Sequence, residues 1–275
     1  MTLATEEKRA QFRRLHESGC FVIPNPWDVG SARALQSMGF QALASTSSGF
    51  AWSIGRSDNH VAVEDVLAHL TELSAGVDLP INADFEGGFA DEPEPVARNV
   101  TRAVATGIAG LSIENSTGKS DRPLYDDKLA VERIAAARAA IDATGSGVVL
   151  VARCEGFLVG EADLSRTIDR LVAFAEAGAD CLYAPGITDR DRVRALVRAV
   201  APKPLNVLMP KPGLSVAELA DLGVRRISVG GALARMAWAG FLHCAREIAE
   251  KGSFADFAGS ASGGELNKLF ANYLG

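Results

Sequence analysis

The sequence predicts an α/β fold, a (β/α)8 barrel of the TIM type with additional helices at the C-terminal end. Short apolar runs alternate with Ala-, Leu- and Arg-rich amphipathic stretches about eight times along the chain. Strands that alternate with helices of this length are typical of βαβ units and a parallel sheet. A length of 275 residues also suits one such barrel. A doubly wound open sheet is the alternative, but no GxGxxG motif follows the first predicted strand.

The predicted strands are short runs of β-branched or apolar residues. They are Phe21–Pro24, Ala42–Thr46, Leu79–Asp84, Gly110–Glu114, Val148–Arg153, Cys181–Ala184, Pro204–Leu208 and Arg226–Val229. The predicted helices follow these strands and carry apolar residues at helical spacing. They are Asp28–Ser37, Val63–Ser74, Pro93–Ala105, Lys128–Ala143, Ala162–Ala177, Asp189–Ala199, Ser215–Asp221 and Gly231–Glu250.

Four glycines support the predicted boundaries. Gly39, Gly107, Gly178 and Gly223 each stand just after a helical pattern and shortly before a strand. Glycine is common at this position because a helix often ends in a left-handed residue. This repeated pattern, in which a glycine ends a helix shortly before the next strand begins, therefore favours a closed barrel of about eight units.

The whole chain, residues 1–275, is expected to be a single domain, because no low-complexity linker divides it. A helix is expected within residues 1–18, which are polar and charged and do not resemble a signal peptide. Residues 251–275 are expected to form a helical extension beyond the eighth unit, which caps the barrel or packs on a neighbour.

Composition excludes several classes of partner. The net charge is -6, and no block of Lys or Arg stands out, so nucleic acid and acidic membrane surfaces are poor partners. No apolar run is long enough to span a bilayer. The four cysteines are far apart and form no CxxC pair, which predicts a reduced, cytoplasmic location.

Polar residues gather where the predicted strands end. The second strand runs into Ser45–Gly49, the third into Asp84–Gly88, the fourth ends at Glu114-Asn115, and the fifth ends at Arg153-Cys154-Glu155. In a parallel barrel the catalytic groups lie at these carboxyl ends. The candidate site is therefore expected there. Asn206 of the seventh strand is either a member of this site or a buried Asn that ties loops together.

Carboxylates at two neighbouring strand ends predict a cation site. Asp84 and Glu86 are two residues apart and would face the same side of an extended chain. With Glu114 they are expected to gather around one point, where like charges need a cation or bound protons. Oxygen ligands without nearby His or Cys favour Mg²⁺ or Mn²⁺. The alternative is that these carboxylates form salt bridges, for instance to Arg153, or cap helices.

Other polar residues suit a small carboxylate substrate. Thr46, Ser47 and Ser48 supply hydroxyl and backbone N–H donors that can hold a carboxylate. Arg153 is a natural bidentate partner for a carboxylate. The alternatives are an ordinary polar loop for the first three residues, and an ion pair with Glu155 or Glu114 for Arg153.

Together these motifs resemble the isocitrate lyase and phosphoenolpyruvate mutase superfamily. The matching segments are STSSG after the second strand, GRSD ending at Asp58, DFEGGF from Asp84, IEN at residues 113–115 and ARCE at residues 152–155. The resemblance covers nearly the whole chain, from about Phe21 to about Glu250. It implies a Mg²⁺-dependent enzyme, and it implies a homotetramer that exchanges the eighth helix between subunits.

The resemblance also implies roles for single residues. Asp84 would be the direct ligand of the metal, and Glu86, Glu114 and Asp58 would hold the ion largely through water. Substrate binding would fall to Thr46, Ser47, Ser48, Arg153 and Asn206. The metal would stabilise the enolate that forms when a neighbouring bond of the substrate breaks.

One loop departs from the superfamily pattern. In the isocitrate and methylisocitrate lyase branch the loop after the fourth strand carries a Cys and a His, whereas residues 117–123 here read TGKSDRP. The sequence therefore favours a lyase that cleaves a C–C bond in an oxaloacetate-like 2-oxo or 2-hydroxy carboxylate, with Lys119 or Ser120 handling protons or excluding water. P–C bond chemistry of the phosphoenolpyruvate mutase or phosphonopyruvate hydrolase type, with Asp58 as nucleophile, is one alternative. A catalytically silent binder of metal and oxo acid is the other.

Overall fold

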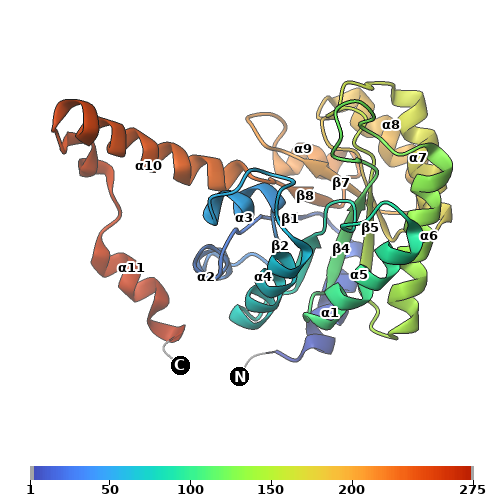
Figure 1. The fold of residues 1–275 in the computed structure, drawn as a ribbon, viewed down its shortest axis with the longest axis horizontal. Coiled ribbons are helices and arrows are strands. Elements are labelled where there is room, and N and C mark those ends of the chain that lie inside the picture. The colour runs from blue at the N-terminus through green and yellow to red at the C-terminus, as the bar shows by residue number, and fades with distance from the viewer. Residues whose placement is uncertain (1–2, 274–275) are drawn as a thin grey trace.

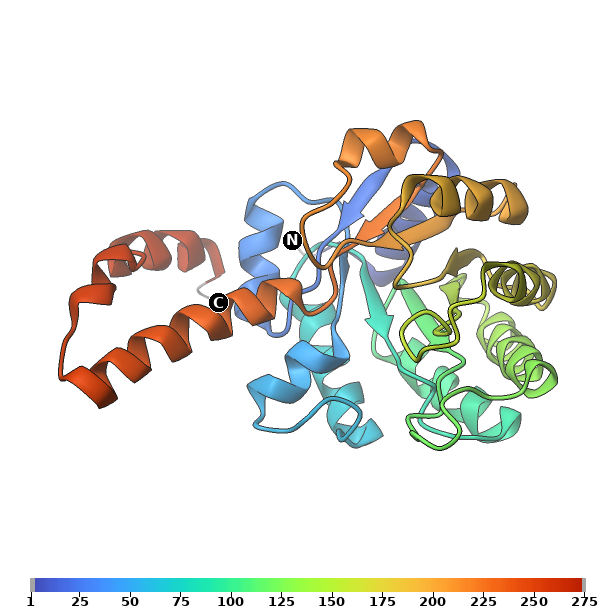
Figure 2. The same cartoon turned by 90° about the horizontal axis from the view of Figure 1, so that it is seen from above.

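Eight parallel strands form one sheet that curves into a nearly closed barrel, and helices alternate with the strands around it (Figures 1 and 2). The computed structural model describes residues 3–273. The strands are β1 (Phe21–Ile23), β2 (Leu43–Ala44), β3 (Ile81–Asp84), β4 (Gly110–Glu114), β5 (Val149–Arg153), β6 (Cys181–Tyr183), β7 (Leu205–Leu208) and β8 (Arg226–Ser228). Their order is β1-β8-β7-β6-β5-β4-β3-β2, which confirms the predicted barrel.

The helices follow the predicted alternation. They are α1 (Thr5–Glu17), α2 (Val29–Ser37), α3 (Ser47–Ser53), α4 (Val63–Gly76), α5 (Pro93–Ala105), α6 (Asp127–Ala143), α7 (Leu164–Glu176), α8 (Arg190–Val200), α9 (Val216–Asp221), α10 (Ala232–Lys251) and α11 (Gly263–Phe270), with short 3₁₀ helices at Ala255–Gly259 and Ala271–Tyr273. Only α3 has no counterpart in the prediction. Within residues 3–273 no helix is both long and apolar enough to cross a membrane.

The barrel interior is closed at its amino-terminal end by α1. The side chain of Phe12 is fully buried and packs with the interior residues Phe21 and Ile23 of β1. Gly110 of β4 leaves room for it, since a Cβ there would lie 2.5 Å from the Phe12 ring. A second and larger apolar layer lies between the strands and the surrounding helices. The open end of the barrel is therefore the carboxyl end of the strands.

The C-terminal segment leaves the barrel. Helix α10 projects away from it, and α11 returns toward α2 (Figures 1 and 2). The return is held by Tyr273, whose hydroxyl accepts a hydrogen bond from Gln36 Nε2 at 3.0 Å and whose ring lies under Arg33. The predicted extension at 251–275 is helical as expected as far as Tyr273, and its last two residues lie outside the described part.

A buried histidine at the base of the barrel predicts a dependence of stability on pH. His16 packs edge-on against Phe12 and Phe21, and burial lowers its pKa to about 3. The unfolded chain takes up this proton near pH 6.5 while the folded chain does not, so stability is lost as pH falls from about 6.5 toward 3. In His16→Gln we expect the loss of unfolding free energy between pH 8 and pH 5 to be about 2 kcal/mol smaller than in the wild type. Urea titrations at both pH values measure it, and an identical loss in both proteins would contradict the assignment.

Candidate active site

A cavity of about 150 Å³ opens at the carboxyl ends of the strands, where the sequence predicted the site. All eight strands or the loops that follow them contribute to its wall. One side carries acidic residues, including Asp58 and Asp84, and the floor carries Arg226. The cavity therefore carries acidic groups on one side and a basic group at its floor.

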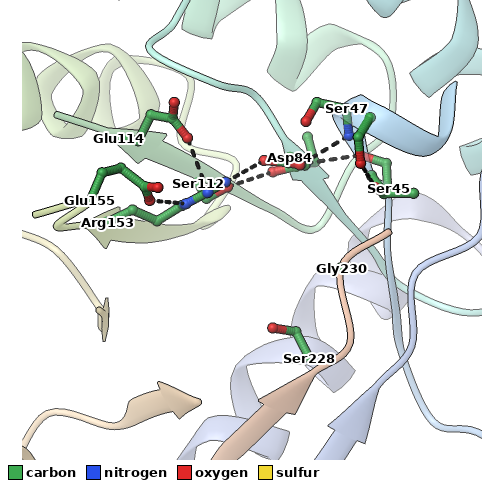
Figure 3. A network of polar contacts seen from close by, with 12 residues as sticks. Ser45, Ser47, Asp84, Ser112, Glu114, Arg153, Glu155, Ser228 and Gly230 are labelled. Carbon is green, nitrogen blue, oxygen red and sulfur yellow. Dashed lines mark hydrogen bonds and ion pairs between the residues drawn. The ribbon is translucent and has the colours of Figure 1, made fainter. Parts of the chain in front are cut away.

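Arg153 stands at the centre of the acidic side (Figure 3). Its Nη1 lies 2.6 Å from Asp84 Oδ1, its Nη2 lies 3.1 Å from Glu114 Oε2, and its Nε lies 2.9 Å from Glu155 Oε1. The parallel register places Glu114 of β4 beside Arg153 of β5, which brings the Arg153–Glu114 pair together. Burial alone would lower the pKa of Arg153, but the three carboxylates outweigh it and raise the pKa well above its usual value. The guanidinium is thus a permanent charge already shared among three partners.

Asp84 is held on its other side by the second strand end. Its Oδ2 accepts a hydrogen bond from the backbone N–H of Ser47 at 3.0 Å, and its own N–H donates to Ser45 Oγ at 2.8 Å (Figure 3). The carboxylate is fixed between β5 and the start of α3. Its orientation toward the cavity therefore depends on residues from both sides of the site.

The remaining acidic residues carry more negative charge than Arg153 can balance. Burial, followed by repulsion from Asp84 and Asp58, raises the pKa of Glu86 to about 8. Burial is also the first cause that raises the pKa of Glu114, Glu155 and Asp58. Three carboxylates thus pair with one guanidinium while Asp58 and Glu86 lie near enough to Asp84 to be repelled by it, and either bound protons or a cation must balance the excess negative charge.

The structure does not bring the three predicted carboxylates together as a ready-made set of ligands, and their holding of one ion stays a prediction. Within residues 3–273 no three Asp, Glu, His or Cys side chains lie close enough together to hold a metal as a set. Arg153 stands between Asp84 and Glu114, as the salt-bridge alternative anticipated. Glu86 lies past the end of β3 in a left-handed conformation, with φ of 45°, so the alternation of an extended chain does not apply to it.

The donor set nevertheless suits Mg²⁺. The ion commonly takes only one or two protein carboxylates and completes its shell with water and substrate oxygens. All the charged ligand candidates here are carboxylates, they carry excess negative charge, and Asp84 and Asp58 line the cavity. The residues present therefore fit a hard cation that keeps several water ligands better than a cation that is coordinated by protein atoms alone.

The predicted substrate loop also lines the cavity. Thr46, Ser47 and Ser48 all contribute to its wall. Thr46 has a second task, because its Oγ1 accepts a hydrogen bond from the N–H of Gly49 and caps α3. The N–H of Ser47 is taken by Asp84, and the hydroxyls of Thr46 and Ser48 lie 3.2 Å apart and share a hydrogen bond.

The loop residues that the sequence suggested for proton transfer lie outside this cavity. Lys119 and Ser120 are exposed, and Nζ of Lys119 lies 3.1 Å from Asp91 Oδ2. Tyr125 donates a hydrogen bond of 2.5 Å to the other oxygen of Asp91, which anchors the loop. Lys119 lines a separate, wider hollow of about 450 Å³ that Glu86 and Glu114 also border. The loop thus lies beside the acidic cluster, without contact to the cavity.

Asn206 is not among the residues that line the cavity. Its Oδ1 accepts a hydrogen bond of 2.9 Å from Arg226 Nε, and its Nδ2 donates to Ser228 Oγ at 3.0 Å. Both partners do line the cavity. Asn206 therefore ties the floor of the site together, as one interpretation of the sequence allowed.

Sequence reasoning missed the residues of the cavity floor. Arg226, Tyr183 and Ser112 line the cavity, as do Gly230 and Gly231 beyond the carboxyl end of β8. The signal in the sequence was Arg226, the second Arg of the segment RRISV, which stands at the start of an apolar strand. A charged residue in such a run is unusual, because an unpaired charge is rarely buried.

Comparisons with known proteins agree with this architecture. The family model of phosphoenolpyruvate phosphomutase matches residues 12–249. An uncharacterized protein of Mycobacterium tuberculosis is 34% identical over 241 residues, which cover 87% of this chain and 89% of that protein. An oxaloacetate decarboxylase of Pseudomonas aeruginosa is 27% identical over 96% of this chain and 91% of its own length. A crystal structure from Burkholderia cenocepacia J2315, provisionally assigned as a lyase/mutase, is 48% identical with a TM-score of 0.93 and covers 97% of this chain and 96% of that one.

Proposed function

The chain belongs to the isocitrate lyase/phosphoenolpyruvate mutase superfamily and is an enzyme of the lyase class, and from this premise we propose that it cleaves a C–C bond in a small 2-oxo or 2-hydroxy carboxylate. The substrate is oxaloacetate-like, and the cofactor is Mg²⁺ or Mn²⁺. The observation that carries this proposal is the group of carboxylates at Arg153, in which Asp84, Glu114 and Glu155 pair with the guanidinium and Asp84 lines the cavity together with Asp58. Such an excess of negative charge suits a divalent cation at the place where a substrate enters.

In this proposal Asp84 holds the ion directly. Asp58, Glu86 and Glu114 hold it through water. When bound, the ion supplies Lewis-acid stabilisation of negative charge on the substrate oxygens. Arg153 keeps the Asp84 carboxylate oriented toward the cavity by its contact of 2.6 Å.

Other residues of the chain orient the substrate and keep water out. Thr46, Ser47 and Ser48 line the cavity, and in this proposal their hydroxyls donate to a substrate carboxylate. Burial raises the pKa of Tyr183 to about 12, so its phenol stays protonated at neutral pH and acts as a further donor at the floor. The loop that carries Lys119 and Ser120 borders the neighbouring hollow, and its closure over the acidic cluster would exclude water.

Turnover of three substrates tests the proposal. Purified protein is mixed with Mg²⁺ and either oxaloacetate, phosphonopyruvate or methylisocitrate, and pyruvate release is followed. We expect oxaloacetate or a related C–C substrate to be cleaved well above the background of free metal. Absence of turnover above that background for all three, despite binding of oxalate, would leave only a silent binder.

A second candidate function is P–C bond chemistry of the phosphoenolpyruvate mutase or phosphonopyruvate hydrolase type. The position of Asp58 in the cavity wall, beside the acidic cluster, favours it, because a carboxylate there can act as a nucleophile. Phosphorus NMR on the same mixtures separates the two functions. Transfer or release of phosphate from phosphonopyruvate would support this candidate over C–C cleavage.

We also propose that the protein is a homotetramer assembled through α10. This helix projects from the barrel (Figure 1). Met236 and Phe241 on it are 72% and 61% exposed. We expect the double variant Met236→Asp/Phe241→Asp to elute as a smaller species in size-exclusion chromatography with light scattering. Met38→Asp, which changes an apolar side chain that is 69% exposed at the end of α2, serves as the control and is expected to keep the wild-type mass. A wild-type monomer, or a double variant of unchanged mass, would contradict the proposal.

A further inference from the structure

The floor of the cavity contains a buried arginine without a charged partner. Arg226 is 2% exposed and stands at the start of β8, inside the barrel. Its Nε donates to Asn206 Oδ1 at 2.9 Å, and its Nη1 donates to Asn82 Oδ1 at 3.3 Å. Both acceptors are neutral amides. Among the described residues Arg226 forms no ion pair.

The two arginines of the cavity therefore differ in their charge balance. Arg153 already shares its charge with three carboxylates and has little left for a ligand. Arg226 keeps its full positive charge in a buried place, where an unpaired charge is costly. The floor of the cavity thus attracts an anion, whereas the wall around Arg153 attracts a cation.

The residues around Arg226 hold its guanidinium in place and leave its Nη2 without a hydrogen-bond partner among the described residues. The register of β7 against β8 places Asn206 beside Arg226, and this contact fixes the plane of the guanidinium. Its Nη2 donates to no described residue, and the side chain lines the cavity. Ser228 and Tyr183, which carry hydroxyl donors, line the same floor. A fixed guanidinium with hydroxyls beside it matches the oxygens of a carboxylate.

We propose that Arg226 binds a second carboxylate of the substrate, so that the enzyme selects dicarboxylates over monocarboxylates. The carboxylate that is attached to the 2-oxo or 2-hydroxy carbon stays at the acidic wall with the cation and the Thr46–Ser48 hydroxyls. The distal carboxylate enters the floor and meets Arg226 Nη2 with the nearby hydroxyls. This inference rests on the proposed function, because it names the substrate class of the same cavity.

Two ligands that differ only at one end test it. Malate and 2-hydroxybutyrate share the 2-hydroxy carboxylate head, and they differ in whether the fourth carbon is a carboxylate or a methyl group. Their binding to the full chain with Mg²⁺ is measured by isothermal titration calorimetry. We expect wild-type protein to bind malate about 10- to 100-fold more tightly, the range for a hydrogen bond to a charged group.

Variants assign the preference to one side chain. Arg226→Gln is expected to weaken malate binding about 10- to 100-fold and to change 2-hydroxybutyrate binding by less than about 3-fold. Arg226→Lys keeps the charge and is expected to lose an intermediate part of the malate affinity. Arg225→Gln is the matched control, because the Arg225 side chain instead donates to the Gly19 carbonyl outside the cavity. It should keep the wild-type ratio of the two affinities.

The outcomes separate this inference from the proposed function. Oxalate is titrated in parallel, and failure of the wild type to bind it with Mg²⁺ would defeat the proposed function itself. Oxalate binding by the wild type, together with equal affinities for malate and 2-hydroxybutyrate, would overturn only the proposed role of Arg226. This comparison uses the wild type alone, so it does not depend on whether a variant folds. An equal loss of both ligands in Arg226→Gln and Arg226→Lys would also overturn it, since that result indicates a structural role.

Discussion

Asp84→Asn is expected to lower kcat/KM for the cleaved substrate by about 10³-fold or more while the protein stays folded. The change removes the carboxylate that is proposed to hold the cation directly, and Lewis-acid stabilisation by a metal is worth several kcal/mol of the activation barrier. The amide is isosteric and keeps an oxygen toward the Ser47 N–H. Arg153 keeps its pairs with Glu114 and Glu155, so the core of the network remains.

The measurement is steady-state kinetics together with Mn²⁺ binding by calorimetry. Asp84→Asn should lose both activity and metal affinity. Asp65→Asn, which alters a half-exposed carboxylate paired with Arg56, is the matched control and should retain both. Wild-type activity in Asp84→Asn would remove this residue from the proposed mechanism.

Arg153→Met is expected to be the most destabilising change in the site, at about 3–5 kcal/mol of unfolding free energy. Asp84, Glu114 and Glu155 would lose the one charge that balances them in a buried place. Removing one partner from a buried ion pair costs more than the pair contributes, because the remaining charges stay uncompensated. Urea titration measures the effect.

A surface arginine provides the comparison. Arg56 lies 3.0 Å from Asp65, with both side chains nearly half exposed, so Arg56→Met should cost about 1 kcal/mol or less. Mg²⁺ is expected to recover part of the stability of Arg153→Met, because a divalent ion can replace the missing positive charge. Equal losses in the two variants would show that the Arg153 network contributes no more than a surface pair.

Most of the fold could be predicted because its signals are local. The strand Gly110–Glu114 and the helix Pro93–Ala105 match the structure to the residue, and the other predicted elements differ by a few residues at their ends. Apolar spacing and the glycines between helix and strand carry this information. Helix α3 was missed because its Ser- and Gly-rich start resembles a loop, and its cap by Thr46 is visible only in the structure.

The site was predictable in its place and only partly in its contacts. The carboxyl ends of parallel strands meet at one end of a barrel, so Asp84, Glu114 and Arg153 were expected near one another. The sequence left open whether Arg153 pairs with carboxylates of the protein or binds a substrate carboxylate. In the structure it pairs with Asp84 and Glu114. The left-handed backbone at Glu86 and the register that joins Asn206 to Arg226 depend on tertiary structure. Those features therefore had no signal in the sequence.

The central claim is that the acidic wall binds a divalent cation together with a 2-oxo acid. A crystal of the protein grown with Mn²⁺ and oxalate, measured at a wavelength where manganese scatters anomalously, tests it most directly. We expect an anomalous peak within coordinating distance of an Asp84 carboxylate oxygen, with both ends of oxalate on the same ion. A crystal without such a peak, in which Asp84 remains paired only with Arg153 and Ser47, would contradict the claim.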